Sequence, residues 1–106
     1  MRPEALEVAI SRTLLTLVDT VERLEQFPIA TFETIVRIML TAPFVLSRAV
    51  LPGMYEKGWG RIVHVSSAHG RRASPFKVAY VTAKHGLEGL SKVIALEGAE
   101  RGVTSN

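Results

Sequence analysis

The stretch RIVHVSSAHGRRASPFKVAYVTAKHG, residues 61–86, predicts a strand followed by a helix. Its first seven residues form a short apolar run rich in β-branched side chains, which is typical of a buried strand in a parallel sheet. After a loop with Gly70 and Pro75, apolar residues from Ala79 onward recur at helical intervals as far as Gly98 or Gly102. A strand joined to a long helix is part of a βαβ unit, so we expect an α/β fold.

The residues before this stretch predict a second long helix that is interrupted by a proline. Apolar side chains keep helical spacing over residues 32–55, with Thr31 as the expected N-cap and Gly58 and Gly60 as stop signals. Pro43 should kink this helix or divide it in two, because proline lacks the N–H that a helix interior needs. Further upstream, residues 4–24 fit an amphipathic helix, although the segment TLLTLVDT (residues 13–20) also fits a short strand.

Composition and charge argue against several classes of protein. The chain has 106 residues, enough for one small domain, and its 47% hydrophobic and 22% charged residues are typical of a globular protein. It has no cysteine, and His64, His69 and His85 are too irregularly spaced for a metal cluster, so we expect no metal. The net charge of +3 is dispersed over 13 basic and 10 acidic residues, which argues against nucleic-acid binding.

No segment predicts a membrane span or a secretory signal. The most apolar stretch, residues 38–46, contains Pro43 and is far shorter than the roughly 20 residues that cross a bilayer, so we expect a core element there. Glu4 and Glu7 precede any long apolar block, which argues against a signal sequence. We therefore expect a cytoplasmic protein with no membrane partner.

Three side chains in the opening stretch form a pattern that suits acid–base chemistry. Tyr80 and Lys84 stand four residues apart on the predicted helix, so they leave the same face. Ser67 lies at the carboxyl end of the predicted strand, where open α/β sheets bind their ligands. A phenol ordinarily ionises only at about pH 10, and a nearby ammonium favours the phenolate, which makes a proton donor and acceptor usable at neutral pH. The serine would donate a hydrogen bond to a substrate oxygen that changes between alcohol and carbonyl.

This Ser-(x12)-Tyr-(x3)-Lys pattern, preceded by GRIVHVSS and followed by ALEGAERGVTSN, resembles the short-chain dehydrogenase/reductase family. Residues 58–97 are similar to its 3-hydroxybutyrate dehydrogenase group, and the resemblance extends over about residues 27–106. It implies an α/β fold, a helix-rich part of a doubly wound, Rossmann-like parallel sheet. The implied activity is hydride transfer between a nicotinamide cofactor, NAD with NADP as the alternative, and a small hydroxy or keto acid such as 3-hydroxybutyrate.

The resemblance also implies roles for individual residues. Ser67, Tyr80 and Lys84 would be catalytic, with Tyr80 and Lys84 also binding the cofactor, while His69 and Lys77 would bind the substrate carboxylate. A plainer interpretation makes His69 a polar loop residue and Lys77 an exposed charge. For five other residues we expect structural roles: packing or surface positions for His64 and His85, solvated charges for Arg71 and Arg72, and a hydrophobic anchor for Trp59.

The sequence departs from the family's pattern in its first part. Every glycine lies at or after Gly53, so no glycine-rich turn for a cofactor pyrophosphate precedes the helices. The family's Asn-Asn-Ala-Gly segment falls near residues 14–17, which read LLTL, and its helix asparagine falls at Met39. We therefore expect a single truncated Rossmann-like domain over residues 1–106, with a diverged segment at 1–26 and the family-like catalytic portion at 27–106.

Two functions stay open at this point. One is the oxidoreductase that the resemblance implies. The other is a non-catalytic remnant that acts as a helix-mediated dimerisation or interaction module. Because the two long helices form the main subunit interface in the family, the resemblance implies a homo-oligomer in both cases.

Overall fold

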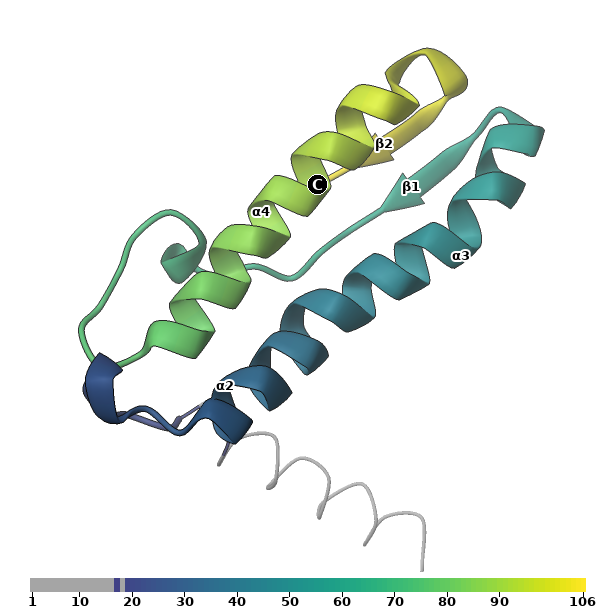
Figure 1. Cartoon of the computed structure of the whole chain (residues 1–106). Helices are drawn as coiled ribbons and strands as arrows, with labels where there is room; N and C mark the ends of the chain where they lie inside the picture. Colours follow the sequence, from purple (N-terminus) through teal and green to yellow (C-terminus); the bar gives the residue numbers. More distant parts are fainter. Residues whose placement is uncertain (1–16, 18) are drawn as a thin grey trace, which may run out of the picture.

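The computed structural model describes residue 17 and residues 19–106, and Figure 1 shows two long helices side by side with a short parallel sheet against one of them. Gly60 pairs with Val103 and Ile62 pairs with Ser105, in parallel register. The strand, helix and strand at the C-terminal half form the βαβ unit that the sequence predicts. The main elements in chain order are α2 (Ile29–Val36), the π-helical turn η2 (Arg37–Thr41), α3 (Ala42–Lys57), β1 (Gly60–Ile62), α4 (Val78–Gly98) and β2 (Val103–Ser105).

The first long helix begins at Ile29, directly after Pro28. Pro28 has extended backbone angles, and its carbonyl oxygen accepts a hydrogen bond from the Phe32 N–H at 3.0 Å. Thr31 therefore lies inside the first turn, and its prediction as N-cap is wrong. The fixed φ of proline suits the position before a helix, and this local constraint outweighs the capping preference of threonine.

The predicted helix at residues 4–24, like its alternative as a strand at 13–20, falls almost wholly outside the described residues. At its described end the helix prediction is wrong, because residues 20–23 are not helical and a single 3-10 turn, Leu24–Gln26, follows them.

The interruption predicted at Pro43 takes the form of a π-helical turn and not of a break in the helix. The π-helical turn η2 comes just before Pro43, which stands in the first turn of α3. A proline ring in a regular α-helix collides with the carbonyl four residues earlier, and a π-helical turn at that place widens the backbone. The helical run nevertheless stays continuous over Ile29–Lys57.

Two glycine turns meet at the end of the molecule where both helices finish. Gly58 has a φ of 68° and ends α3, as predicted, while Gly102 has a φ of 77° before β2. The backbone of Gly102 lies so close to the Gly58 carbonyl oxygen that a Cβ atom there would collide with it. The Gly60 N–H donates to the Gly102 carbonyl oxygen at 3.0 Å, so the close contact of the turns starts the strand pairing.

β1 is shorter than the strand predicted over residues 61–67. Its ladder with β2 covers Gly60–Ile62. At its far end the His64 N–H donates to the Asn106 carbonyl oxygen at 2.7 Å, and the Asn106 N–H donates to the Ile62 carbonyl oxygen at 3.0 Å. A strand exists only where a neighbour pairs with it. The described pairing with the β2 segment reaches His64 and Asn106, and no ladder hydrogen bond involves residues 65–67.

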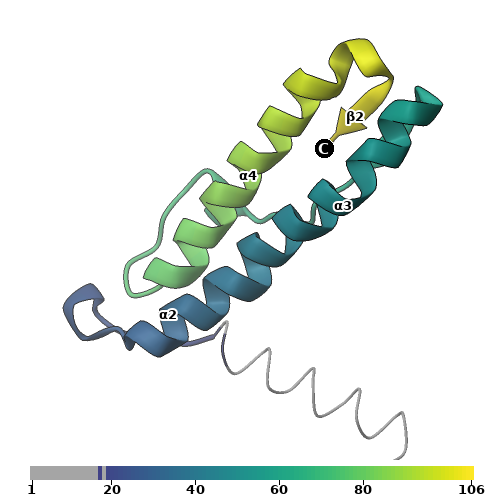
Figure 2. The same cartoon turned by 45° about the vertical axis from the view of Figure 1, so that its right-hand side comes forward.

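α4 carries most of the core. Ala79, Ala83, Leu87 and Ile94 are buried at helical spacing, and Figure 2 shows α4 alongside α2 and α3. The helix ends at Gly98, and a 3-10 turn leads on to the left-handed glycine before β2, which confirms the predicted end of the helix. The small side chains of Ala79 and Ala83 allow the backbones of α4 and α2 to lie close together.

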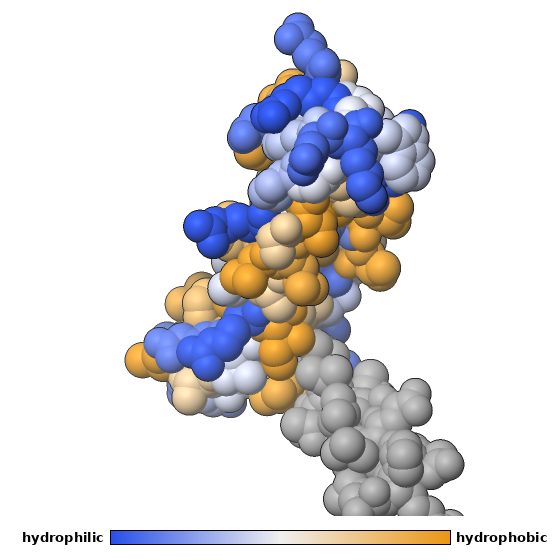
Figure 3. All heavy atoms as spheres, turned by 90° about the vertical axis from the view of Figure 1, so that its right-hand side faces the viewer, coloured by the Kyte–Doolittle hydropathy of each residue, from blue (hydrophilic) through white to orange (hydrophobic). Residues whose placement is uncertain are grey.

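α3 buries little of its surface, and Ser47 is its one buried residue. Phe44, Val45 and Leu46 are 49%, 52% and 66% exposed, and Figure 3 shows hydrophobic side chains gathered in a band over this side of the molecule. The prediction of a core element at residues 38–46 is therefore wrong for this arrangement. By length and composition alone, Ile29–Lys57 would even serve as a membrane span, so the apolar run is longer than the nine residues considered from the sequence.

Trp59 does not anchor the turn between α3 and β1. Its side chain is 61% exposed, and the Arg61 guanidinium lies 4.8 Å from the ring centroid on the surface. The prediction of a buried anchor is wrong, because glycines rather than an aromatic side chain hold this turn together.

Candidate functional site

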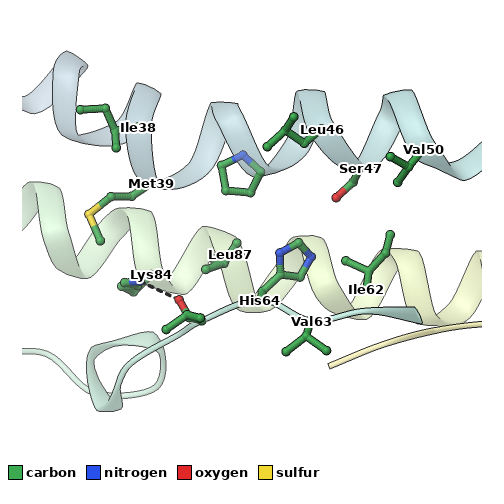
Figure 4. A pocket seen from close by; sticks show the side chains of 12 residues that line it. Ile38, Met39, Leu46, Ser47, Val50, Ile62, Val63, His64, Lys84 and Leu87 are labelled. Atoms are coloured by element: carbon green, nitrogen blue, oxygen red, sulfur yellow. Dashed lines mark hydrogen bonds between the residues drawn. The ribbon is translucent and has the colours of Figure 1, made fainter. Parts of the chain in front are cut away.

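Lys84 is a residue of α4, and its side chain points toward the extended segment that follows β1. It is 8% exposed, and its Nζ donates a hydrogen bond to the Val65 carbonyl oxygen at 2.8 Å, as Figure 4 shows. An ammonium group has three N–H donors, and within the described part of the chain this is the one engaged. The remaining donors are free to bind hydroxyl groups of a ligand.

Tyr80 lies one helical turn before Lys84 on the same face of α4. The Lys84 Nζ is 5.8 Å from the centroid of the Tyr80 ring, so the spacing in sequence does bring a cation next to the phenol. The Tyr80 hydroxyl has no hydrogen-bond partner among the described residues, and the side chain is half-buried. Its oxygen is therefore available to a substrate.

Ser67 and His69 occupy the turn that follows the strand segment. Ser67 is the N-cap of a 3-10 turn, Ala68–Gly70, and its Oγ accepts a hydrogen bond from the His69 N–H at 3.2 Å. The His69 ring meets the Tyr80 ring edge-on, with centroids 5.5 Å apart and an interplanar angle of 78°. The turn thus brings the His69 ring next to the phenol, and the His69 N–H joins Ser67 to the same turn.

Lys77, the other residue predicted to bind a substrate carboxylate, is the N-cap of α4. The residue before it, Phe76, has a φ of 69°, which is uncommon for a side chain of that size. The Lys77 side chain makes no hydrogen bond or ion pair with the described residues. The structure therefore places Lys77 at the start of α4 and leaves its ammonium without a contact to the other four predicted site residues.

A cleft with a volume of about 470 Å³ lies between α3, the β1 segment and α4. Lys84 lines it, but Ser67 and Tyr80 do not, so it is not centred on the predicted chemistry. Most of its lining is apolar, and Figure 4 shows Ser47 and His64 pointing into the space between α3 and the strand. Of the five predicted site residues, Lys84 alone is among the residues that line this cleft.

Two polar atoms behind the site have no partner among the described residues, namely His64 Nε2 and Ser66 Oγ. Burial lowers the pKa of His64 from its ordinary value of 6.5, because desolvation disfavours the charged imidazole. His64 is half-buried, which fits the packing role among the packing and surface roles expected for it. His85, Arg71 and Arg72 lie at the surface, as expected.

Sequence reasoning missed two partners of the site. The Val65 carbonyl oxygen that holds Lys84 is a backbone atom, and no residue type identifies it in advance. The Ser74 hydroxyl lies 2.7 Å from His69 Nε2 across the loop, and its position depends on the path of residues 70–76. No spacing rule in the sequence identifies such a contact.

Comparison with known proteins supports the resemblance that the motif carries. The short chain dehydrogenase family model matches residues 16–106. D-beta-hydroxybutyrate dehydrogenases of Rhizobium meliloti and Cupriavidus necator are 52% and 51% identical over 84% and 81% of this chain. The chain spans about a third of the length of these relatives, 34% and 33%.

Solved structures give the same result for the fold. A short-chain dehydrogenase from Streptomyces avermitilis matches 80% of this chain and 31% of its own, with a TM-score of 0.76 and 32% identity. A protein from Beutenbergia cavernae proposed to be an NAD(P) dependent gluconate 5-dehydrogenase matches 81% of this chain and 34% of its own, with a TM-score of 0.78 and 31% identity. The predicted fold class, part of a Rossmann-like parallel sheet, is confirmed. The chain belongs to the short-chain dehydrogenase/reductase family.

Proposed function

We propose that this chain carries the catalytic corner of an oxidoreductase that interconverts a small hydroxy acid, such as 3-hydroxybutyrate, and the corresponding keto acid with a nicotinamide cofactor. The observation that carries the proposal is the cluster at the end of the strand segment, where the His69 N–H contacts Ser67 Oγ and the Tyr80 ring lies against both His69 and Lys84. The similarity to D-beta-hydroxybutyrate dehydrogenases suggests the substrate class. We expect the cytoplasm as its compartment.

Tyr80 would move the proton of the reaction. During reduction of a ketone its hydroxyl gives a proton to the substrate oxygen, and during oxidation of an alcohol the phenolate oxygen takes one. The Lys84 ammonium stabilises the negative charge that develops on the phenol oxygen. Ser67 Oγ already accepts a hydrogen bond from the His69 N–H, so its own hydrogen is free to point at the substrate oxygen.

His69 and Lys77 would recognise the carboxylate of the substrate. A carboxylate accepts charge-assisted hydrogen bonds, and an imidazole N–H together with an ammonium group supplies donors for it. Lys77 lies three residues before Tyr80 at the N-terminus of α4, where the helix dipole also favours an anion. A small acid would thus be held at one end while its oxygen meets the phenol at the other.

The described residues fit one end of a nicotinamide cofactor. The two unengaged N–H donors of Lys84 suit the hydroxyls of a ribose, and Tyr80 would lie beside the nicotinamide. The cofactor, NAD or NADP, would supply or accept the hydride. The sequence has no glycine before Gly53, so these residues supply no glycine-rich cradle for the pyrophosphate.

A second copy of the chain would cover the exposed helix face as a homo-oligomer. The outward side chains of α3, including Val45 and Leu46, are half or more exposed, and so are Val93 and Leu96 on α4. An apolar surface of this kind on two neighbouring helices is typical of a contact between subunits. The same observation favours a second candidate function, a non-catalytic module that associates through its helices.

A binding titration of the purified chain separates the two functions. NADH fluorescence is followed in the presence and absence of acetoacetate, with Lys84→Met as the test variant and Lys92→Met as the matched control on the same helix. The oxidoreductase requires saturable binding that Lys84→Met abolishes and Lys92→Met retains. Absence of saturable binding in the unmodified chain, with a dimer present by sedimentation, would overturn the oxidoreductase and support the association module.

A further inference from the structure

Ser74, a loop serine outside the predicted site, contacts the catalytic cluster through His69. Its Oγ lies 2.7 Å from His69 Nε2, and both side chains are half-buried. His69 in turn contacts two predicted catalytic residues, because its N–H donates to Ser67 Oγ and its ring meets the Tyr80 ring edge-on. A hydroxyl five residues away thus holds the ring of the residue that contacts both of them, through its N–H and through the ring itself.

We propose that Ser74 is a positioning residue that fixes the His69 imidazole and selects its tautomer; this inference rests on the proposed function. A neutral imidazole has one nitrogen that donates and one that accepts. A substrate carboxylate accepts hydrogen bonds, and Nε2 is occupied by Ser74, so Nδ1 is the ring nitrogen left to donate. With the proton on Nδ1, Nε2 accepts from the Ser74 hydroxyl, and the Nδ1–H is left to donate to the substrate carboxylate.

The turn that carries His69 also holds Ser67 through backbone N–H groups. Ser67 caps the turn through two contacts, since the Gly70 N–H donates to its carbonyl oxygen at 2.9 Å and the His69 N–H donates to its Oγ. Rotation of the His69 ring would also disturb its edge contact with Tyr80. Ser74 therefore acts on substrate recognition and on the geometry of the phenol without touching either.

Nitrogen NMR of the His69 ring tests the tautomer directly and needs no catalysis. In the unmodified chain at a pH where the ring is neutral, we expect the Nδ1-protonated tautomer to dominate. Ser74→Ala should shift the ring signals to a mixture of tautomers, and Ser74→Thr, which keeps the hydroxyl, should restore them. Ser91→Ala is the control, because it removes a different side-chain hydrogen bond, 2.8 Å to Ser105 Oγ. Unchanged His69 signals in Ser74→Ala would overturn the proposal.

A kinetic comparison adds the functional consequence. Loss of one hydrogen bond to a group that binds an anion should raise the KM for acetoacetate about tenfold in Ser74→Ala, with a smaller change in kcat and recovery in Ser74→Thr. An equal loss in Ser74→Thr would contradict the hydroxyl's role and indicate a packing effect. If the unmodified chain binds no keto acid, the proposed function fails, and the NMR result alone decides whether Ser74 positions His69.

Discussion

α4 and α3 lie side by side and are both rich in apolar residues, yet α4 is buried along one face and α3 is not. α4 contributes Ala79, Ala83 and Leu87 to the core, together with the buried ammonium of Lys84, whereas the buried residue of α3 is Ser47. The difference lies in what each helix has beside it, because α4 packs against β2 and α2. α3 has its outer side free of any described residue, as the hydrophobic band in Figure 3 shows.

This comparison separates two kinds of apolar pattern. Other residues of this chain cover the apolar stripe of α4, so packing fixes Tyr80 and Lys84 relative to the strand segment. No described residue covers the outer apolar face of α3, so a second surface is needed to bury it. Predictions about α4 therefore concern chemistry and folding, and predictions about α3 concern association.

The largest expected effect is on α4, at Tyr80. Tyr80→Phe removes the oxygen that would carry the proton and should lower the rate of acetoacetate reduction by a factor of about 10² to 10⁴. The free energy of unfolding should change little, because the hydroxyl has no hydrogen-bond partner in the described part of the chain. NADH absorbance measures the rate.

Tyr55→Phe is the matched control for that substitution, since Tyr55 lies on α3 with the Arg101 guanidinium 3.7 Å from its ring centroid. The Tyr55→Phe variant should reduce acetoacetate at nearly the rate of the unmodified chain. Equal losses in the two variants would mean that the Tyr80 hydroxyl is not the proton carrier.

The turn at Gly102, which connects α4 to β2, should show the next largest effect. Gly102→Ala places a Cβ against the Gly58 carbonyl oxygen at a φ of 77°, and we expect a loss of about 3 kcal/mol in the free energy of unfolding. Gly89→Ala is the control, because nothing lies within 4 Å of its Cβ position on α4, and it should gain up to about 1 kcal/mol. Urea unfolding followed by circular dichroism measures both, and a neutral Gly102→Ala would show that the two turns do not meet as described.

The exposed face of α3 should respond in association rather than in folding. Val45→Glu places a charge where a second copy would pack, and we expect the dimer dissociation constant to rise roughly 100-fold, because an unpaired charge is costly to bury. Lys92→Glu changes the charge more, but on the flank of α4 beside Ser105 and Asn106, and should leave the constant unchanged. Sedimentation equilibrium measures it. If both variants dimerise equally well, the band in Figure 3 is not the subunit contact.

The sequence predicted the features that depend on a residue's own backbone preferences. Gly58 and Gly102 end their helices because they adopt left-handed φ, and Pro43 interrupts the long helix because it lacks an N–H. Thr31 failed as a cap because Pro28 constrains the chain three residues earlier. Local rules of this kind hold until a neighbouring rule is stronger.

Features that depend on a second segment were predicted less well. The strand over residues 61–67 is shorter than expected because its ladder ends where β2 ends. Phe44, Val45 and Leu46 are exposed because no described residue covers them. At the site, the spacing of Tyr80 and Lys84 predicted their proximity, whereas the contacts of Lys84 with Val65 and of Ser74 with His69 follow from the path of the loop. The catalytic roles of these residues stay predictions.

The smallest expected effect lies at His64, between α3 and α4. Burial lowers its pKa below 6.5, so as the pH falls below 6.5 the unfolded chain takes up a proton before the folded chain does. The contribution of neutral His64 to the free energy of unfolding is complete above pH 6.5 and is lost as the pH falls through the lowered pKa. The urea midpoint should therefore fall with pH across that range, and His64→Asn should remove this pH dependence.

His85→Asn, at an exposed position, should keep the slope and serves as the control. A slope that persists in His64→Asn would assign the pH dependence to another group.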